Sequence, residues 1–230
     1  MTWSWPRSLL GALLAATLGG CAREALPPEV PGMVELPVAT ETGAQASALP
    51  MRHGAKKGKL GLVIPDGDRC LSWLEQEGVR FHPLPPKPGM VTPVAVTGSI
   101  GGVSYESGDR GALVCDCRLV VALGWLGPEL RSLGVREVRH AGAYAYRTTK
   151  RGRPSLHAQG LAIDVWGLST RAAHYDVKRD FVRGAECGDA STPLNQLACD
   201  VRRMGLLEEV ITPDDDSDHR DHVHLAIAPL

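Results

Sequence analysis

Two stretches of this sequence alternate between apolar residues and polar or small ones: Ser155-Leu156-His157-Ala158-Gln159-Gly160-Leu161-Ala162-Ile163-Asp164-Val165 and Asp221-His222-Val223-His224-Leu225-Ala226-Ile227. A period of two indicates a β-strand with one buried face. We interpret the first stretch as a loop that leads into a strand, in which Leu161, Ile163 and Val165 face the core. The opposite face carries only small residues apart from Asp164, which leaves room there for an ion or a substrate backbone.

The second stretch has the same pattern, with apolar Val223, Leu225 and Ile227 on one face and His222 and His224 on the other. If the two strands are neighbours in one sheet, these histidines meet the carboxylate of the first strand. The histidine of the preceding loop can then fold over the same patch. The pattern therefore predicts one cluster of imidazoles around a carboxylate.

The residue types in this cluster favour zinc, which binds imidazole nitrogens and carboxylate oxygens. A set of three protein ligands leaves the fourth position open for water, which is the catalytic arrangement. Either stretch alone is more often a solvated strand edge, but their matching faces favour a metal site. We therefore predict one zinc ion held by imidazoles and the carboxylate of this cluster, for which the candidate ligands are His157, Asp164, His222 and His224.

Elsewhere the sequence pattern mixes helices and strands. Apolar residues at helical spacing predict helices over residues 117–132 and 193–204, and a shorter helix is expected over 70–77. Strands are expected over 91–96 and 103–105. Because these elements do not alternate as β-α-β units, the predicted fold class is α+β, an antiparallel sheet with flanking helices.

The first twenty residues indicate export. An apolar run from Leu9 to Leu18 follows the single charge of Arg7; the run is too short to span a bilayer but fits a signal peptide. It ends in Leu18-Gly19-Gly20-Cys21, which resembles the lipobox of bacterial lipoproteins, whose cysteine carries acyl chains. The alternative is an ordinary cleaved signal followed by a chance cysteine.

We therefore divide the chain into a lipoprotein signal peptide over 1–20, a flexible Pro/Ala-rich tether over 21–59 and a zinc-binding domain over 60–230. With lipid on Cys21 as the membrane anchor, the domain is expected in the bacterial cell envelope, facing the periplasm. Ala22 follows Cys21 where an Asp would retain the protein at the inner membrane. By analogy with Gram-negative lipoproteins, we expect the outer membrane.

Composition and charge exclude some functions. The 25 Lys and Arg residues nearly balance the 26 Asp and Glu residues, so the basic surface that a nucleic-acid-binding protein needs is not expected. An acidic run over residues 214–218 lacks the spacing of a calcium-binding EF-hand. We interpret it as a solvated loop, with His219 exposed beside it.

Export makes disulfides possible, and five cysteines remain besides Cys21: Cys70, Cys115, Cys117, Cys187 and Cys199. An odd number allows at most two bridges and leaves one free thiol. Proximity in the sequence favours a bridge between the last two. The first is expected to pair with either member of the central Cys-x-Cys pair; a metal site at that pair is the alternative.

The residues of the two stretches also resemble a known superfamily, the zinc D-alanyl-D-alanine carboxypeptidases, which includes the Hedgehog signalling domain. The similar motif is Ser155-x-His157-x-x-Gly160-x-Ala162-x-Asp164, followed by His222-x-His224. Within the superfamily, the chain most resembles the extensin-like C-terminal family of exported bacterial proteins, over about residues 65–230. Tyr146-Arg147 upstream of the motif supports this resemblance.

The resemblance implies roles for individual residues. His157, Asp164 and His224 would be the three zinc ligands, and a residue just before the last of them would act as the base. His222 is preferred for this role because imidazole titrates near neutral pH, and Asp221 is the alternative. The usual Glu is absent at this place. Arg147, which follows Tyr146, would stabilise the developing oxyanion, and Ser155 would orient the substrate or a ligand.

The resemblance further implies a zinc peptidase that cleaves peptidoglycan peptide, as a D,D-carboxypeptidase or an endopeptidase. The expected partners are peptidoglycan peptide and, through the lipid on Cys21, the membrane; no nucleic acid is expected. Two alternatives stay open. One is a non-catalytic, zinc-stabilised module that binds the cell wall, and the other is a structural envelope lipoprotein.

Overall fold

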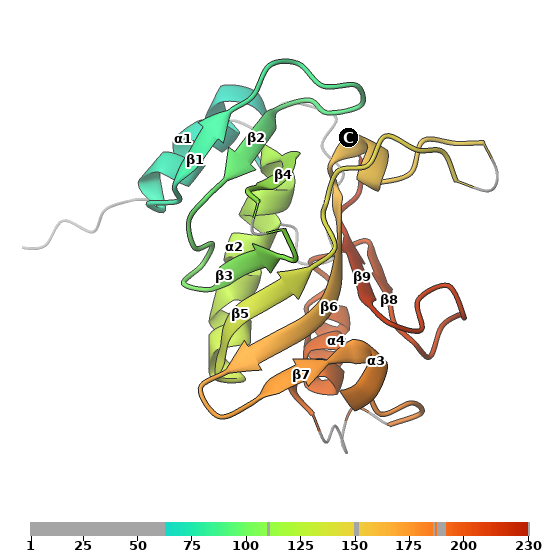
Figure 1. Cartoon of the computed structure of the whole chain (residues 1–230). Helices are drawn as coiled ribbons and strands as arrows, with labels where there is room; N and C mark the ends of the chain where they lie inside the picture. The colour runs from blue at the N-terminus through green and yellow to red at the C-terminus, as the bar shows by residue number, and fades with distance from the viewer. Residues whose placement is uncertain (1–62, 110, 150–151, 186, 188–191, 230) are drawn as a thin grey trace, which may run out of the picture. The chain divides into compact units, whose positions relative to one another are not determined.

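The computed structural model describes residues 63–109, 111–149, 152–185, 187 and 192–229 (Figure 1). The predicted signal peptide, Cys21 and the tether over 21–59 lie outside the described residues. Within those ranges, no helix combines the length and the apolar character that crossing a membrane requires.

Helices and strands are mixed along the described part of the chain, as the predicted α+β class requires. The helices are α1 (Gly67–Gln76), α2 (Cys117–Ser132), the 3₁₀ helix η1 (His157–Gln159), α3 (Val177–Asp180) and α4 (Pro193–Met204). The strands are β1 (Phe81–Pro83), β2 (Pro93–Val96), β3 (Ser104–Ser107), β4 (Leu113–Asp116), β5 (Val135–His140), β6 (Ala162–Thr170), β7 (His174–Asp176), β8 (Glu209–Ile211) and β9 (Val223–Ala226).

The strands form two sheets. The smaller has the order β1-β2-β4, and the larger has the order β3-β5-β6-β9-β8, with β7 paired to β6. Every pair is antiparallel except β3 with β5, which is parallel. The prediction of an antiparallel sheet is therefore wrong for this pair. The chain between β3 and β5 contains β4 and α2, which supplies the long crossover that a parallel pair needs.

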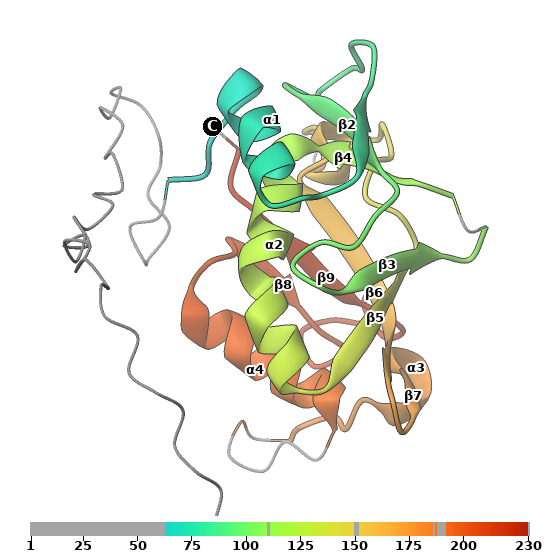
Figure 2. The ribbon, with the colours of Figure 1, turned by 90° about the vertical axis from the view of Figure 1, so that its left-hand side faces the viewer.

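The helices α2 and α4 lie side by side on one face of the larger sheet (Figures 1 and 2). Both have the bounds that the sequence predicts. The Thr192 hydroxyl accepts from the N–H of Asn195 at the start of α4, and Gly205 ends that helix in the left-handed conformation. α2 is the centre of the core, because ten of its residues are buried and β5, α1 and α4 pack around it.

A buried carboxylate fixes the start of α2. Asp116 accepts hydrogen bonds from the N–H groups of Val91 and Thr92, at 2.8 and 2.9 Å, and forms a buried ion pair with Arg118 at 2.7 Å. The N–H of Asp116 itself donates to the carbonyl of Gly160 at 3.0 Å. Since Gly160 directly follows η1, these bonds tie the centre of the core to the turn that carries His157.

Two disulfides occur among the described residues. Cys70 of α1 is bonded to Cys117 at the start of α2, and Cys187 is bonded to Cys199 of α4. Cys115 is free and fully buried. The expectation of two bridges and one free thiol agrees with this pairing. The alternative metal site at the Cys-x-Cys pair does not form, because one of its two thiols is in a bridge.

Cys115 should resist thiol reagents in the folded protein and react after unfolding. Burial and the neighbouring Asp116 carboxylate raise the pKa of its thiol, so little reactive thiolate forms. Under non-reducing conditions, iodoacetamide should leave Cys115 unmodified in buffer and should modify it in guanidinium chloride. Labelling of Cys21 is measured as a separate peptide. Labelling of Cys187 or Cys199 under those conditions would contradict the disulfide assignment.

Candidate metal centre

The pairing of β6 with β9 brings the two sequence stretches together. Their antiparallel register places Asp164 directly opposite His224, with Ile163 opposite Leu225. Opposite residues in such a pair project to the same face, so the carboxylate and the imidazole share one face of the sheet. The side chains of Ile163 and Leu225 are buried in the core. The predicted alternation of core-facing and site-facing residues is therefore confirmed for β6 and β9.

His157 reaches this face from η1. The Ser155 hydroxyl accepts the N–H of Ala158 at 3.1 Å, which fixes the start of the turn. Gly160 ends the turn with φ of +64°, and a Cβ atom there would lie 2.6 Å from the Asp116 nitrogen. Only glycine satisfies both demands, so the turn is held rigidly against the core.

Three ligand atoms converge at the centre of this cluster. His224 Nδ1 lies 2.8 Å from Asp164 Oδ1, and His157 Nε2 lies 3.1 Å from the same oxygen. The two imidazole nitrogens are 3.3 Å apart. Among the described residues these three form a group that can hold a metal ion, with all ligand atoms within 4.8 Å of one another. Two nitrogens and one oxygen fit the preferences of zinc.

The outer nitrogen of His157 has a hydrogen-bond acceptor, and the outer nitrogen of His224 has an ion-pair contact with a carboxylate. His157 Nδ1 lies 3.2 Å from the carbonyl of Ala143, and His224 Nε2 lies 3.5 Å from the carboxylate of Glu209. When these nitrogens carry the protons, His157 Nε2 and His224 Nδ1 present lone pairs to the centre. Acceptors of this kind orient histidine ligands in metal sites and set their tautomers.

Asp164 is ionised within the cluster. Burial alone would raise the pKa of its carboxyl, but in the tautomers that carry the proton on His157 Nε2 and His224 Nδ1, hydrogen bonds from these two groups hold that pKa far below its usual range. The carboxylate thus stays charged at every physiological pH, as a metal ligand must. His157 and His224 are 5% and 8% exposed, so the three side chains form a nearly closed cradle.

The family model of the extensin-like protein C-terminus matches residues 68–229 of this chain. The chain belongs to this extensin-like family. A search of curated proteins and a search of solved structures found no match. The family match covers all three ligand candidates of the cradle.

His222 of the extensin-like domain lies at the edge of the cradle. Its Nε2 atom is 3.7 Å from Asp164 Oδ1, and its Nδ1 atom is 2.9 Å from the carboxylate of Asp221. The His222 side chain is 21% exposed, against 44% for Asp221. The hydrogen bond with His222 also lowers the pKa of the Asp221 carboxyl. Of the two predicted base candidates, His222 is therefore the one that faces the ligands.

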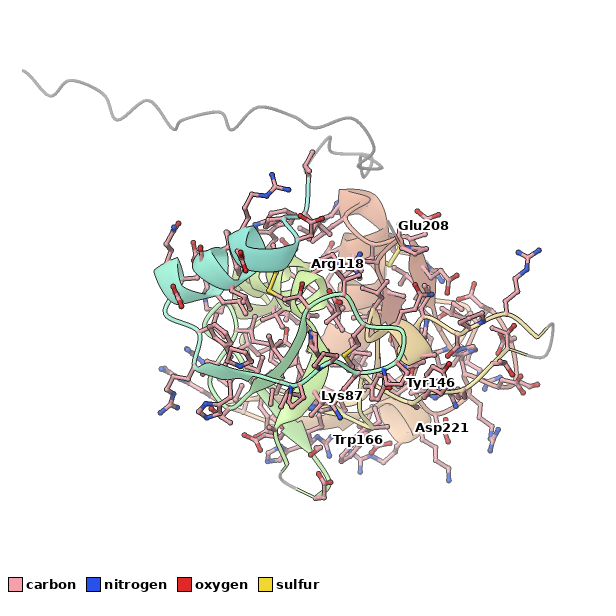
Figure 3. All side chains as sticks on the ribbon, turned by 90° about the horizontal axis from the view of Figure 1, so that it is seen from above. Lys87, Arg118, Tyr146, Trp166, Glu208 and Asp221 are labelled. Atoms are coloured by element: carbon pink, nitrogen blue, oxygen red, sulfur yellow. A yellow bond between two sulfur atoms is a disulfide. The ribbon has the colours of Figure 1, made fainter. Side chains whose placement is uncertain are left out.

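The remaining predicted site residues lie outside the cradle. Arg147 is exposed, and its backbone carbonyl accepts the N–H of Ser155 at 3.1 Å. Among the described residues, the Arg147 side chain forms no hydrogen bond or ion pair with the three ligand candidates. Its neighbour Tyr146 is 70% exposed (Figure 3). Ser155 supports the turn that carries His157.

Two neighbours of the cradle were missed by the sequence reasoning. The ring of His219 lies 4.9 Å from that of His222 and 5.7 Å from that of His224, and its Nδ1 is 2.7 Å from Asp216. Its side chain is only 18% exposed, so the expectation of an exposed His219 is wrong. The spacing His-x-x-His-x-His was the available signal. No sequence signal points to Glu209, because this residue reaches the cradle only through the pairing of β8 with β9.

One zinc ion per chain should bind to the purified extensin-like domain and should be lost in His157→Ala or Asp164→Ala. Two remaining ligands hold zinc far more weakly than three. Glu209→Gln should retain zinc with an affinity reduced by about 10-fold, because only the orientation of His224 is weakened. Competition with a fluorescent chelator measures the zinc affinity of all three variants. His82→Ala, on exposed β1, is the matched control, and full zinc in either ligand variant contradicts the site.

Proposed function

We propose that the extensin-like domain is a zinc-dependent peptidase that cleaves peptidoglycan peptide, of the D,D-carboxypeptidase or endopeptidase type. The observation that carries the proposal is the convergence of two imidazoles and one carboxylate in a cradle bordered by a further histidine. When bound by three protein ligands, zinc polarises a carbonyl and lowers the pKa of water at its open position. The resemblance to the D-alanyl-D-alanine carboxypeptidase superfamily, with its Hedgehog-like fold, supports the choice of substrate.

We assign the general base to His222. Its Nδ1–H donates to Asp221, which leaves a lone pair on Nε2, the atom that points toward Asp164. An imidazole held in this way can accept a proton from the attacking water and return it to the leaving amine. Asp221 then acts as a positioning residue, because it fixes the ring and its tautomer.

Arg147 and Ser155 complete the proposed machinery. A guanidinium group is a strong, permanently charged donor for an oxyanion that develops at a scissile carbonyl. The backbone carbonyl of Arg147 accepts the N–H of Ser155, which precedes His157 by two residues. The exposed side chain of Arg147 therefore lies on the chain segment that leads to His157. Ser155 orients the ligand turn with its hydroxyl.

A second candidate function is a non-catalytic, zinc-stabilised module that binds the cell wall. The exposure of Arg147 favours it, since an oxyanion donor is usually held in place before the substrate arrives. In that case zinc held by the cradle stabilises the fold, and bound cell-wall peptide is not cleaved.

His222→Ala should keep zinc and the fold but reduce hydrolysis of cell-wall peptide by about 10²–10⁴-fold, the usual effect of losing a general base. Arg147→Ala should also keep zinc and lose turnover. Asp221→Ala should have a smaller effect than His222→Ala. Release of products from purified peptidoglycan, followed by chromatography, measures turnover, with His82→Ala as the control. If zinc-loaded wild type binds peptidoglycan without cleaving it, the binding-module function replaces the peptidase.

We also propose that the protein is a periplasm-facing outer-membrane lipoprotein anchored by lipid on Cys21. The disulfides Cys70–Cys117 and Cys187–Cys199 support an oxidising compartment. Cys21→Ser should move the protein from the membrane fraction to the periplasmic fraction, as shown by immunoblotting. An unchanged membrane fraction would contradict the anchor.

A further inference from the structure

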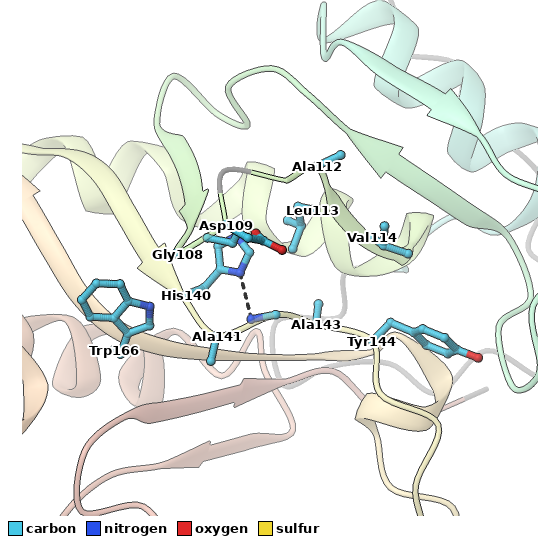
Figure 4. Close-up of a pocket in the computed structure, with 12 residues that line it drawn as sticks. Gly108, Asp109, Ala112, Leu113, Val114, His140, Ala141, Ala143, Tyr144 and Trp166 are labelled. Atoms are coloured by element: carbon cyan, nitrogen blue, oxygen red, sulfur yellow. Dashed lines mark hydrogen bonds between the residues drawn. The ribbon is translucent and has the colours of Figure 1, made fainter.

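The pocket beside the end of β5 has a buried histidine at its floor (Figure 4). His140 is 1% exposed, and its Nδ1 atom accepts the N–H of Gly142 at 3.0 Å. Its Nε2 atom is also buried and has no hydrogen-bond partner in the described part of the chain. Burial keeps this nitrogen from a ligand, so the ring contributes to packing at the floor of the pocket.

A different pocket, with accessible polar groups, lies where α1, α2 and the connection between β2 and β3 meet. Figure 2 shows these three segments together. The volume of this pocket is about 370 Å³, within the range of about 300–1,000 Å³ that is typical of ligand pockets. None of its lining residues belongs to the metal cradle. The lining side chains that carry functional groups are Trp73, Glu77, Ser99 and Arg131.

Close backbone contacts shape the wall of this pocket. A Cβ atom at Gly124, inside α2, would lie 2.5 Å from Trp73 Cη2, so the indole lies directly over the helix backbone. A Cβ atom at Gly101 would lie 2.7 Å from the carbonyl oxygen of Gly124, so the β2–β3 connection also packs directly on α2. Glycine inside a helix is destabilising relative to alanine. The seat that Gly124 provides for the Trp73 ring explains its presence there.

The Trp73 ring is held in place and remains accessible. It contacts Trp125 in a T-shaped arrangement, with ring centroids 6.4 Å apart, and the disulfide Cys70–Cys117 ties its helix to α2. The Trp73 side chain is only half-buried. Its indole N–H has no hydrogen-bond partner among the described residues, and this nitrogen is not buried. The ring therefore offers a ligand both an apolar surface and a free donor.

Three exposed polar side chains line the same pocket: Glu77, Ser99 and Arg131. Within the described ranges, the Glu77 carboxylate and the Ser99 hydroxyl form no hydrogen bond or ion pair. Arg131 uses one nitrogen, Nη1, which donates to the carbonyl of Gly101. The remaining guanidinium N–H groups are available to a ligand. One carboxylate and one guanidinium give these side chains no net charge, which favours a neutral ligand that both donates and accepts hydrogen bonds.

We propose that this pocket binds a neutral sugar unit of a polysaccharide. A pyranose ring has an apolar face of C–H groups and a rim of hydroxyl groups that donate and accept. The indole of Trp73 supplies the surface for the apolar face. The indole N–H and Arg131 donate to the hydroxyls, Glu77 accepts from them, and Ser99 does both. The inference goes beyond the proposed peptidase; only the choice of the N-acetylated cell-wall glycan as the source of the sugar rests on that function.

The test measures oligosaccharide binding to the zinc-loaded full chain by calorimetry. The probes are the tetramer of N-acetylglucosamine and cellotetraose, which contain no peptide and differ in the N-acetyl groups. Trp73→Ala should weaken binding of the N-acetylated tetramer by about 10-fold, because the apolar face of the sugar loses its surface. Glu77→Ala should weaken it by about 3–10-fold, because an acceptor is lost. Glu75→Ala, an exposed carboxylate on the same helix outside the pocket, is the matched control and should leave binding unchanged.

Should Trp73→Ala not fold, the indole ¹⁵N–H NMR signal of Trp73 in the parent chain decides. It must shift on addition of the tetramer, whereas the signal of Trp166, whose ring contacts Arg139 outside this pocket, must stay in place. An unshifted Trp73 signal overturns the proposal. Binding that persists unchanged in Glu77→Ala and Trp73→Ala overturns it as well, as does the absence of binding of either probe.

The sugar site and the peptidase can fail separately. If wild type cleaves cell-wall peptide but binds neither probe, the peptidase stands and the sugar site is overturned. If wild type binds the N-acetylated tetramer through Trp73 but cleaves no peptide, the sugar site stands as part of a binding module. Binding of cellotetraose with equal affinity supports the sugar site and overturns the N-acetylated glycan as its specific source.

Discussion

The cradle depends on the register between β6 and β9. Asp164 lies opposite His224 because Ile163 and Leu225, one residue away on each strand, are buried together in the core. A slip by one residue would turn the imidazole away from the carboxylate and expose the apolar side chains. Burial of the core therefore selects the register, and the register brings together two of the three ligand candidates.

The third ligand candidate depends on contacts that are distant in the sequence. The turn that carries His157 is held by the bond from the Asp116 N–H to the Gly160 carbonyl, at the start of the most buried helix. The adjacent Cys117 is bonded to Cys70 of α1. Disulfide, buried carboxylate and ligand turn thus form one continuous unit. Strain or loosening at the start of α2 would reach the cradle through a single hydrogen bond.

Patterns between residues close in the sequence were enough to predict two of the helices and the shared face of two ligand candidates. Strand alternation predicted the face that Asp164 and His224 share, and helical spacing predicted α2 and α4 with their bounds, because each pattern depends on neighbours a few residues away. Two features depend on tertiary contacts, which no local pattern encodes: the parallel pairing of β3 with β5, and the approach of Glu209 through β8. His219 was misjudged because the acidic run around it suggested solvent, whereas its ring packs on two other histidines.

The difference between a structural and a catalytic zinc centre is whether a fourth protein ligand closes the site. His222 is the described residue nearest to that role, with its Nε2 atom 3.7 Å from Asp164 Oδ1. Yet it is outside the group whose ligand atoms all lie within 4.8 Å of one another. Its bond to Asp221 also holds the ring toward the more exposed side of the cradle. If the three ligand candidates hold zinc with a fourth position open, a histidine beside them but outside the compact group would be placed to exchange protons with a molecule bound there. The position of His222 thus supports the proposed peptidase rather than the alternative in which zinc only stabilises the fold.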